Sequence, residues 1–527
     1  MIAWHYKIFG VGLYHVFLIE GHDILLNGKD HGKGILMGFT TQTFLFIFLP
    51  VCMLVYYSLY FLSTRGKLGH LVRKYRLIEL ALIALSCGFY AWACFDDVLR
   101  LCIFILAVYI FGKLIALSKE KAYALELVGA EEPGLLHRKL LPISKIVQFV
   151  GVTVVVYYLI FEKYWDAVIG GWNWMFSCEI PSHSIVPPLG ISFLTFSAIS
   201  YLVDISRGAA KAGNLIDCAL YLSFFPKVIS GPTVLWRDFQ TQIPGGKITL
   251  DRCVEGVDRI MIGFAKKLIL ADTFGACIAR MPSPEIDRAA AWGAALLYML
   301  QLYYDFSGYS DIAIGLAKLL GFDFKENFRF PYLSKSVTEF WRRWHISLGT
   351  WFREYVYFPL GGSQRGMKNT LRNLAIVFLL TGIWHGNGLN YLLWGGINGF
   401  FVVLERLVRE KPLYKKTPDW AKWLCTMAIT LLCWQLFRFN QMEEFSQWTS
   451  NAFLGVRNPV IPYTWIHYFD KQIIILTAVG ALGSTLFGLK RVQDAYQRII
   501  STKLGHAVYE IVLLALFVAS ILFMVNS

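Results

Sequence analysis

Long apolar stretches, separated by short polar ones, dominate the chain. Many of them reach the roughly 20 residues that a helix needs to cross the hydrocarbon core of a bilayer. The clearest lie at 41–62, 77–95, 98–117, 141–161, 186–203, 423–439, 471–489 and 508–525. A soluble protein of 527 residues would have to bury all of these stretches in one core. The pattern therefore predicts an all-α, polytopic membrane protein of about 11–13 helices.

The middle of the chain, about 186–400, differs from both ends because Pro, Gly, Arg and Asp interrupt its apolar stretches. The interruptions gather in 224–239, 303–315 and 341–362. Polar groups at membrane depth are costly, and irregular backbone is tolerated there only inside the protein or along a wet cavity. Interfacial loops would explain any one of these segments. Three of them within 140 residues favour short re-entrant helices around a central tunnel.

Residues 1–36 are unlike the rest of the chain. They are rich in Gly and His and contain neither a spanning segment nor the basic-then-apolar order of a signal peptide. Met37 directly precedes the first apolar stretch. We interpret residues 1–36 as an upstream extension before the natural start, with a short surface helix as the alternative.

Composition and charge support the membrane assignment. Only 16% of the residues are charged, whereas soluble domains carry about 25%. The net charge of +14 is compatible with nucleic-acid binding, but the basic residues gather between apolar stretches, at 65–76, 119–139, 406–422 and 490–503. Basic loops stay in the cytoplasm. We therefore expect no nucleic-acid partner, a multi-pass protein of the cell's inner membrane, and both termini on the extracytoplasmic side.

The ten cysteines are scattered, mostly within apolar stretches, and no CxxC pair is present. Neither a zinc site nor a redox couple is indicated. Small apolar residues in helices are the simpler explanation, and we predict no metal site.

Two of the eleven histidines have unusual neighbours. His385 follows Trp384 in an apolar stretch that also contains several glycines and Asn387, and His345 lies in the segment WRRWHISL. A neutral imidazole can take up a proton near neutral pH, and glycines let a substrate approach the backbone. A single histidine in an apolar stretch is more often structural. The Gly-Asn surroundings of His385 leave both roles open.

Asp305 and Asp311 bracket a short Ser-Gly-Tyr-Ser segment. Carboxylates in an apolar region need partners, and Arg342 and Arg343 are available by charge. A structural ion pair is favoured over catalysis for these four residues. The chain has no GxSxG elbow, no HExxH pair and no phosphate-binding loop, so covalent serine catalysis has no support in the sequence.

Taken together, several motifs resemble the membrane-bound O-acyltransferase family, and most closely its bacterial branch of alginate O-acetyltransferase membrane-subunit type. The resemblance covers residues 37–527 as one domain, with its catalytic core at about 186–400. The matching segments, in order, are FLFIFLP (44–50), PPLGISFLTFSAISYLVDISRG (187–208), FFPKVISGP (224–232), GFAKKLILAD (263–272), YYDFSGYSDIAIGLAKLLGF (303–322), WRRWH (341–345) and TGIWHG (381–386). In FFPKVISGP, Lys227 stands where some relatives carry glutamine.

The resemblance implies transfer of an acyl group, most simply acetyl, across the membrane. The donor would be a cytoplasmic thioester, acetyl-CoA or an acyl-carrier protein, and no bound cofactor is expected. The family's essential histidine falls on His385, which would act as general base on an acceptor hydroxyl, and its second histidine falls on His345. The expected partner is an extracytoplasmic SGNH-type acetyltransferase or relay protein that modifies a polysaccharide, with membrane lipid around the protein. The remaining supporting residues are Trp384, Asn387, Asp305, Asp311, Arg342 and Arg343.

Three alternatives remain open at this point. A transporter or flippase for a lipid-linked glycan would use the same intramembrane charges as a substrate path. A non-enzymatic scaffold for polymer export would affect the polymer itself rather than its ester content. Within the family, a D-alanyl-type transferase would use an aminoacyl carrier protein as its donor.

Overall fold

The computed structural model describes residues 38–127, 133–181, 187–243, 245–281, 286–439, 441–455 and 464–526, with side chains for all of these except 121–127 and 133–142. These residues form helices joined by turns and short loops, and no strand occurs among them. The all-α class predicted from the apolar pattern is confirmed.

The chain divides into two compact units. We call residues 38–256 with Ala313–Lys325 the first unit, and Val257–Ile312 with 326–526 the second unit. The boundaries fall within the helices α10 (Leu250–Phe264) and α12 (Arg288–Leu319).

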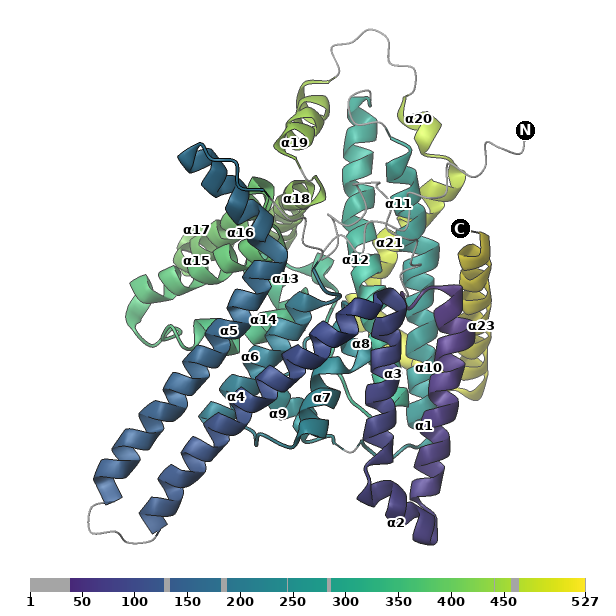
Figure 1. Cartoon of the computed structure of the whole chain (residues 1–527). Coiled ribbons are helices and arrows are strands. Elements are labelled where there is room, and N and C mark those ends of the chain that lie inside the picture. Colours follow the sequence, from purple (N-terminus) through teal and green to yellow (C-terminus); the bar gives the residue numbers. More distant parts are fainter. Residues whose placement is uncertain are drawn as a thin grey trace. The chain divides into compact units, whose positions relative to one another are not determined.

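The first unit is built around a long antiparallel helix pair and one buried helix. The pair is α4 and α5, which lie side by side in Figure 1. The buried helix is α6, whose residues from Ile191 to Ile205 are all buried. The helices of this unit are α1 (Leu49–Ser63), α2 (Gly66–Lys74), α3 (Leu77–Ala93), α4 (Phe95–Leu127), α5 (Pro133–Phe176), α6 (Ile191–Arg207), α7 (Leu215–Ser223), α8 (Phe225–Val228) and α9 (Trp236–Gln240), preceded by the π-helical turn η3 (Phe44–Phe48).

The second unit contains the segments that carry both candidate histidines. Its core is rich in aromatic residues from α12, α13, α16 and α18. Besides part of α12 it comprises η4 (Ala265–Ala271), α11 (Asp272–Ala279), η6 (Pro331–Leu333), α13 (Val337–Arg343), α14 (Ile346–Phe352), η7 (Arg353–Tyr357), α15 (Gly366–His385), α16 (Leu389–Val408), α17 (Pro412–Lys416), α18 (Asp419–Arg438), α19 (Met442–Thr449), η8 (Ser450–Leu454), α20 (Trp465–Tyr468), α21 (Lys471–Thr485), η9 (Leu486–Gly488), α22 (Lys490–Ile500) and α23 (Lys503–Asn526).

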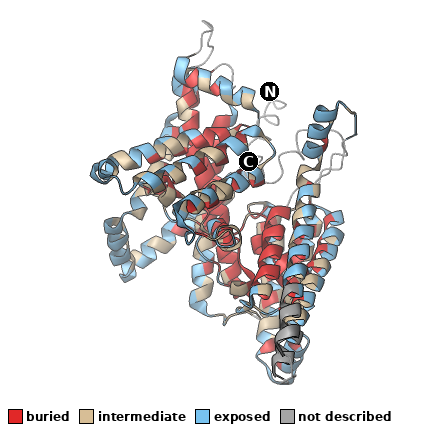
Figure 2. Cartoon of the chain, turned by 90° about the vertical axis from the view of Figure 1, so that its left-hand side faces the viewer, coloured by how far each residue is buried: buried red, intermediate tan, exposed pale blue. Residues whose placement is uncertain are grey.

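Six helical segments of the described chain are long and apolar enough to cross a membrane. They are Phe44–Ser63, Phe95–Glu120, Ile143–Phe176, Leu389–Val408, Lys471–Gly488 and Lys503–Asn526. A seventh span results if α2 and α3, which meet at a bend of 55°, are taken together. These segments expose many apolar side chains, as the pale blue outer helices of Figure 2 illustrate. Such a surface is expected where lipid, rather than water, surrounds the helices.

Most of the predicted spanning stretches coincide with these helices, but two do not. The stretch at 186–203 contributes to α6, which is buried within its unit, and the stretch at 423–439 lies in α18. Neither helix is among the six candidate spans. Instead α16, inside the predicted core, is a candidate span that the apolar pattern did not single out. The expected extension at 1–36 lies outside the described residues.

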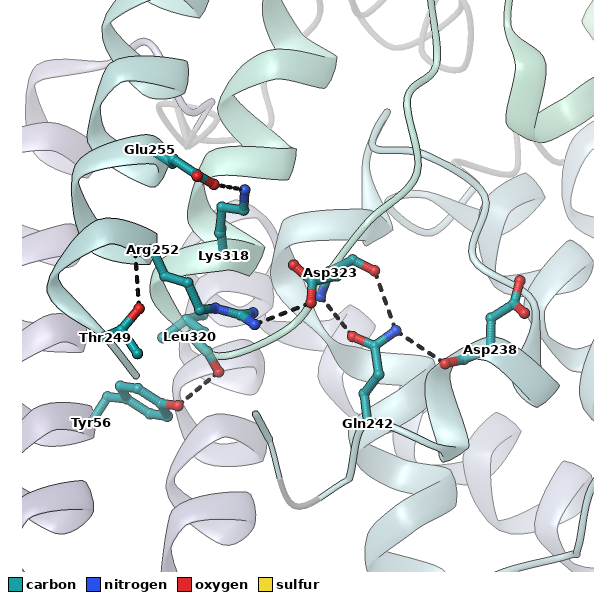
Figure 3. A network of polar contacts seen from close by, with 9 residues as sticks. All are labelled: Tyr56, Asp238, Gln242, Thr249, Arg252, Glu255, Lys318, Leu320 and Asp323. Atoms are coloured by element: carbon teal, nitrogen blue, oxygen red, sulfur yellow. Dashed lines mark hydrogen bonds and ion pairs between the residues drawn. The ribbon is translucent and has the colours of Figure 1, made fainter. Parts of the chain in front are cut away.

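A polar network fixes the turn that follows α12 in the first unit (Figure 3). Arg252 forms an ion pair of 3.1 Å with Asp323, whose backbone N–H donates to Gln242 at 2.6 Å. The hydroxyl of Tyr56 donates to the carbonyl of Leu320 at 2.7 Å. Side chains from three separate segments therefore hold this turn in place.

Candidate functional site

His385 is the last residue of α15 and lies among aromatic rings. Its ring centroid is 4.4 Å from that of Trp384, 4.9 Å from Trp394 and 5.0 Å from Phe437. Trp394 and Phe437 come from α16 and α18, so three helices converge on this histidine. The imidazole is half-buried, whereas both of these partner rings are buried. Hydrogen bonds and charges are strengthened in such surroundings because little water screens them.

Glycines bring α15 and α16 close together beside His385. A Cβ atom on Gly382 would lie 2.6 Å from the carbonyl oxygen of Tyr391 and 3.2 Å from Cα of Gly395. A Cβ on Gly386 would lie 2.4 Å from the ring of Tyr391. The glycines around His385 therefore serve close helix packing.

Asn390, rather than Asn387, links the His385 turn to α18. The side chain of Asn390 is buried and its amide nitrogen donates to the carbonyls of Leu436 and Phe439, at 3.2 Å and 2.5 Å. Asn387 is exposed and forms no hydrogen bond within the described part of the chain. The expected supporting role of Asn387 toward the histidine stays a prediction, and the buried amide at this turn is that of Asn390.

His345 lies between α13 and α14 in a left-handed backbone conformation, with φ of +46°. A residue with a side chain rarely adopts this conformation, and it is typical of sites where surrounding structure imposes a geometry. The imidazole is 4% exposed and stands edge-on to the ring of Phe306 at 4.7 Å. Its Nδ1 lies 3.1 Å from Oδ1 of Asn327.

Burial, and not the charge of the neighbouring arginines, keeps His345 neutral. His345 lies outside the six candidate spans, and burial lowers the pKa of its imidazole well below the usual value. Arg342 is exposed, and Arg343 forms an ion pair of 2.6 Å with Glu339. The imidazole is therefore neutral at pH 7 because it is desolvated.

The two histidines approach a common group of tryptophans from different sides. His385 contacts Trp394, and His345 directly follows Trp344. The ring of Trp434 lies 6.0 Å from Trp394 and 4.9 Å from Trp344. No ring contact or hydrogen bond joins the two imidazoles themselves, both of which are described. The arrangement is one of two separate polar points along an aromatic wall.

The two aspartates are ion-paired, as expected, but their partners are not Arg342 and Arg343. Asp305 lies 2.8 Å from Nζ of Lys267, and Asp311 lies 2.6 Å from Nζ of Lys266 and 2.8 Å from Nε of Arg259. Both carboxylates are buried.

The partners of the aspartates come from the helix that precedes them in the chain. Lys266 and Lys267 belong to the segment GFAKKLILAD, where η4 has π-helical turns. Sequence reasoning missed them because the segment lies about 40 residues away from the aspartates. A pair of lysines within an apolar stretch was the available signal, since buried cations need carboxylates.

The chemistry that this site can support follows from its two imidazoles, of which His345 is neutral. A half-buried imidazole at a helix end can take a proton from a hydroxyl, and a dry aromatic wall can hold an apolar acyl chain. Asp305 and Asp311 are occupied in ion pairs, which gives them a structural role. The site is therefore suited to acyl transfer assisted by a general base.

The fold and the site together define a helical membrane protein with a histidine at the end of an apolar helix. The sequence profile of the membrane-bound O-acyltransferase family matches residues 144–440. This chain belongs to that family and is an acyltransferase.

The chain is similar to several O-acetylating proteins. A probable alginate O-acetylase of Pseudomonas aeruginosa is 38% identical over 419 residues, which cover 77% of this chain and 73% of the relative. A probable alginate O-acetylase of Pseudomonas putida is 36% identical over 83% of this chain and 88% of its own length. A peptidoglycan O-acetyltransferase of Helicobacter pylori is 31% identical over 54% of this chain and 60% of its own length.

Proposed function

We propose that this protein moves an acetyl group from a cytoplasmic thioester to an acceptor hydroxyl on the outer side of the membrane, for O-acetylation of an extracytoplasmic polysaccharide. The similarity to alginate and peptidoglycan O-acetylating proteins supports the polysaccharide as the final target. The alternating basic segments support a cytoplasmic donor side.

The observation that carries the proposal is the position of His385 where α15, α16 and α18 converge. Its ring is packed by Trp394 and Phe437 and stays half-exposed. As general base it takes the proton of the acceptor hydroxyl while the oxygen attacks the thioester carbonyl. The thiolate leaves as the carbonyl re-forms and receives the proton from the imidazolium. Atoms and charges balance without a cofactor.

The acceptor in this proposal is delivered by a second protein. An extracytoplasmic acetyltransferase or relay of SGNH type would carry the acetyl group from this chain to the glycan. We propose acetyl-CoA as the donor. An acyl-carrier protein is the alternative donor, and the similarity to a teichoic acid D-alanyltransferase supports it. That protein, from Bacillus subtilis, is 29% identical over 48% of this chain and 67% of its own length.

Thiol release by the purified full chain in detergent tests the proposal. With acetyl-CoA, we expect release of free thiol that depends on His385, and we expect acetyl-loaded carrier protein to be slower. Faster thiol release with the acetyl-loaded carrier protein would identify a carrier protein as the donor. Absence of thiol release with both donors, in a preparation that also contains the extracytoplasmic partner, would contradict the transfer itself.

A further inference from the structure

Asn327 holds His345 through a set of hydrogen bonds whose direction is fixed. Asn327 is 1% exposed, and its Oδ1 lies 3.3 Å from the backbone nitrogen and 2.8 Å from Oγ of Ser347. A backbone N–H can only donate, so this side-chain atom of Asn327 is the acceptor oxygen and not the amide nitrogen. The amide nitrogen, on the other side, donates to Oγ of Ser310 at 3.0 Å.

The orientation of Asn327 determines the tautomer of His345. Oδ1 accepts from Nδ1 of His345 at 3.1 Å, so the proton of the neutral ring is on Nδ1. Nε2 then carries a lone pair and can accept a hydrogen bond but cannot donate one. A neutral His345 in this tautomer cannot donate a hydrogen bond from Nε2 to an acyl carbonyl oxygen.

Nε2 of His345 is buried and has no hydrogen-bond partner among the described residues. A buried acceptor without a partner carries a free-energy cost, and such atoms in native structures call for an explanation. The left-handed backbone of the same residue adds strain to that cost. Both costs fall on one residue, which points to a hydrogen-bond donor supplied by a ligand.

The position of His345 indicates which ligand supplies that donor. The start of α13 is fixed by Glu405, whose carboxylate accepts from the backbone N–H groups of Val337 and Thr338 at 2.5 Å and 2.9 Å. Glu405 directly precedes the basic segment 406–422, which we place in the cytoplasm. On the next turn of α13, Nε1 of Trp341 donates to Oδ1 of Asn398 at 3.2 Å, and the Trp341 ring lies 5.5 Å from that of Trp394, which contacts His385. The helix α13 therefore runs from the level of Glu405 toward that of His385, and His345, which follows α13, lies at the end of the site where the proposed function places the thioester.

We propose that Asn327 is a positioning residue that holds His345 in the tautomer whose Nε2 accepts a hydrogen bond from an amide N–H of the pantetheine arm of the thioester donor. The proposal rests on the proposed function for the identity of the donor. Acetyl-CoA and acyl-carrier proteins share this arm, which has two amide N–H groups. In this arrangement His345 binds the donor equally in the ground and transition states, and His385 performs the proton transfer.

Most charged groups around His345 form ion pairs with one another. From α12, Asp311 pairs with Lys266 of η4 and with Arg259 of α10, and Arg259 also pairs with Glu326 in the loop that carries Asn327. On α13, Arg343 pairs with Glu339, and Arg342 is exposed. The ring itself faces Phe306, Asn327 and Ser347, none of which titrates near neutral pH.

The first experiment compares two small thioesters with the purified full chain, by thiol release. S-acetyl-N-acetylcysteamine has one amide N–H, and S-ethyl thioacetate has none. We expect the wild type to have a kcat/KM about three- to tenfold higher for the amide-bearing thioester, the factor that a neutral hydrogen bond typically contributes. The intrinsic reactivities of the two thioesters, measured with hydroxide, are divided out first. Asn327→Leu and His345→Phe should abolish this preference mainly through KM.

Two control variants separate positioning from general destabilisation. Asn373→Leu removes another fully buried asparagine of the same unit, which donates to the carbonyls of Leu360 and Gly362. Ser310→Ala removes the acceptor of the Asn327 amide nitrogen but leaves the contacts of its Oδ1 in place. Both variants should keep the preference for the amide-bearing thioester. A preference that persists in Asn327→Leu, or that is lost equally in Asn373→Leu, overturns the proposal.

A second measurement does not depend on acyl transfer. Binding of coenzyme A to the full chain, followed by tryptophan fluorescence, should weaken about three- to tenfold in Asn327→Leu. In Asn327→Asp, the loss of coenzyme A binding as the pH falls should occur at a higher pH than in the wild type. The new carboxylate stabilises the imidazolium form and so raises the pKa of His345. Unchanged affinity in both variants overturns the proposal. Weakened binding in a protein that releases no thiol from any donor would instead contradict the proposed transfer and leave the donor contact standing.

Discussion

The side chains of Lys267 and Asp305 form an ion pair of 2.8 Å in which both residues are buried. Lys267 also lies 2.5 Å from Asp272, so one cation serves two carboxylates. Removing the lysine leaves the buried carboxylate of Asp305 and the partly exposed one of Asp272 without their cation, whereas removing Asp305 leaves a lysine that is still paired. The three residues therefore differ in how much the fold depends on them.

Lys267→Met should be the most destabilising change in this group, at about 3–5 kcal/mol, because uncompensated buried charge is costly. Asp305→Asn should cost less. The measurement is thermal unfolding of the detergent-purified protein, with Lys335→Met as control, since Lys335 pairs with Asp419 on the surface. A control variant that unfolds as early as Lys267→Met would show that burial of the pair does not matter.

His385→Ala should lower acetyl transfer by about 10²–10⁴-fold, the contribution typical of a general base, while the protein stays in the membrane at normal abundance. His345→Ala should reduce activity through donor binding and leave a measurable remainder, and His345→Gln should recover part of it. The measurement is the O-acetyl content of the polysaccharide, with membrane levels from immunoblots. His506→Ala, at an exposed histidine, serves as the control. Acetylation near the wild-type level in His385→Ala would remove the general-base role.

Gly382→Ala should disturb the site through packing alone. The added Cβ would meet the carbonyl of Tyr391 at 2.6 Å, and backbone atoms cannot move aside as a flexible side chain can. We expect α15 and α16 to separate, with a loss of about 1–3 kcal/mol in stability and a larger loss of activity. Gly396→Ala is the matched control on α16, because its nearest neighbour would be Leu379 at 4.0 Å. Equal effects of the two substitutions would contradict the packing explanation.

Apolar periodicity was sufficient to predict the helical class, because the length of an apolar stretch is set by the bilayer. It could not separate α6 from a spanning helix, since a helix buried in protein and a helix buried in lipid are both apolar. The pairing of Asp305 with Lys267 also lay beyond the sequence. Many cations were available by charge, and only the fold decides which of them comes within reach.

The two histidines could be selected from the sequence because their neighbours were unusual, but their surroundings could not. Asn327 lies in an unremarkable loop 18 residues before His345. Its importance comes from a turn of the chain that places a backbone N–H, a hydroxyl and an imidazole on one oxygen atom. The contact of Asn390 with α18 was hidden for a similar reason, since a helix that begins at Leu389 turns the side chain of Asn390 toward α18.

The orientation of the chain in the membrane can be tested at two exposed positions. His70 lies in α2, within the basic segment that we place in the cytoplasm, and Trp172 lies near the end of α5. The apolar part of α5, Ile143–Phe176, is 34 residues long, or about 51 Å. This exceeds the roughly 30 Å of a hydrocarbon core, so position 172 should project from the bilayer.

We predict that an impermeant thiol reagent labels Trp172→Cys in intact cells but labels His70→Cys only after the membrane is opened. The ten native cysteines must be replaced first, because several of them, including Cys94, Cys102 and Cys425, are exposed. The sign follows from the charges: 65–76 is rich in Lys and Arg, which stay in the cytoplasm, while 162–185 has one Lys and no Arg. Equal labelling of both positions in intact cells would contradict this orientation, and labelling of His70→Cys alone would reverse it, together with the sides assigned to donor and acceptor.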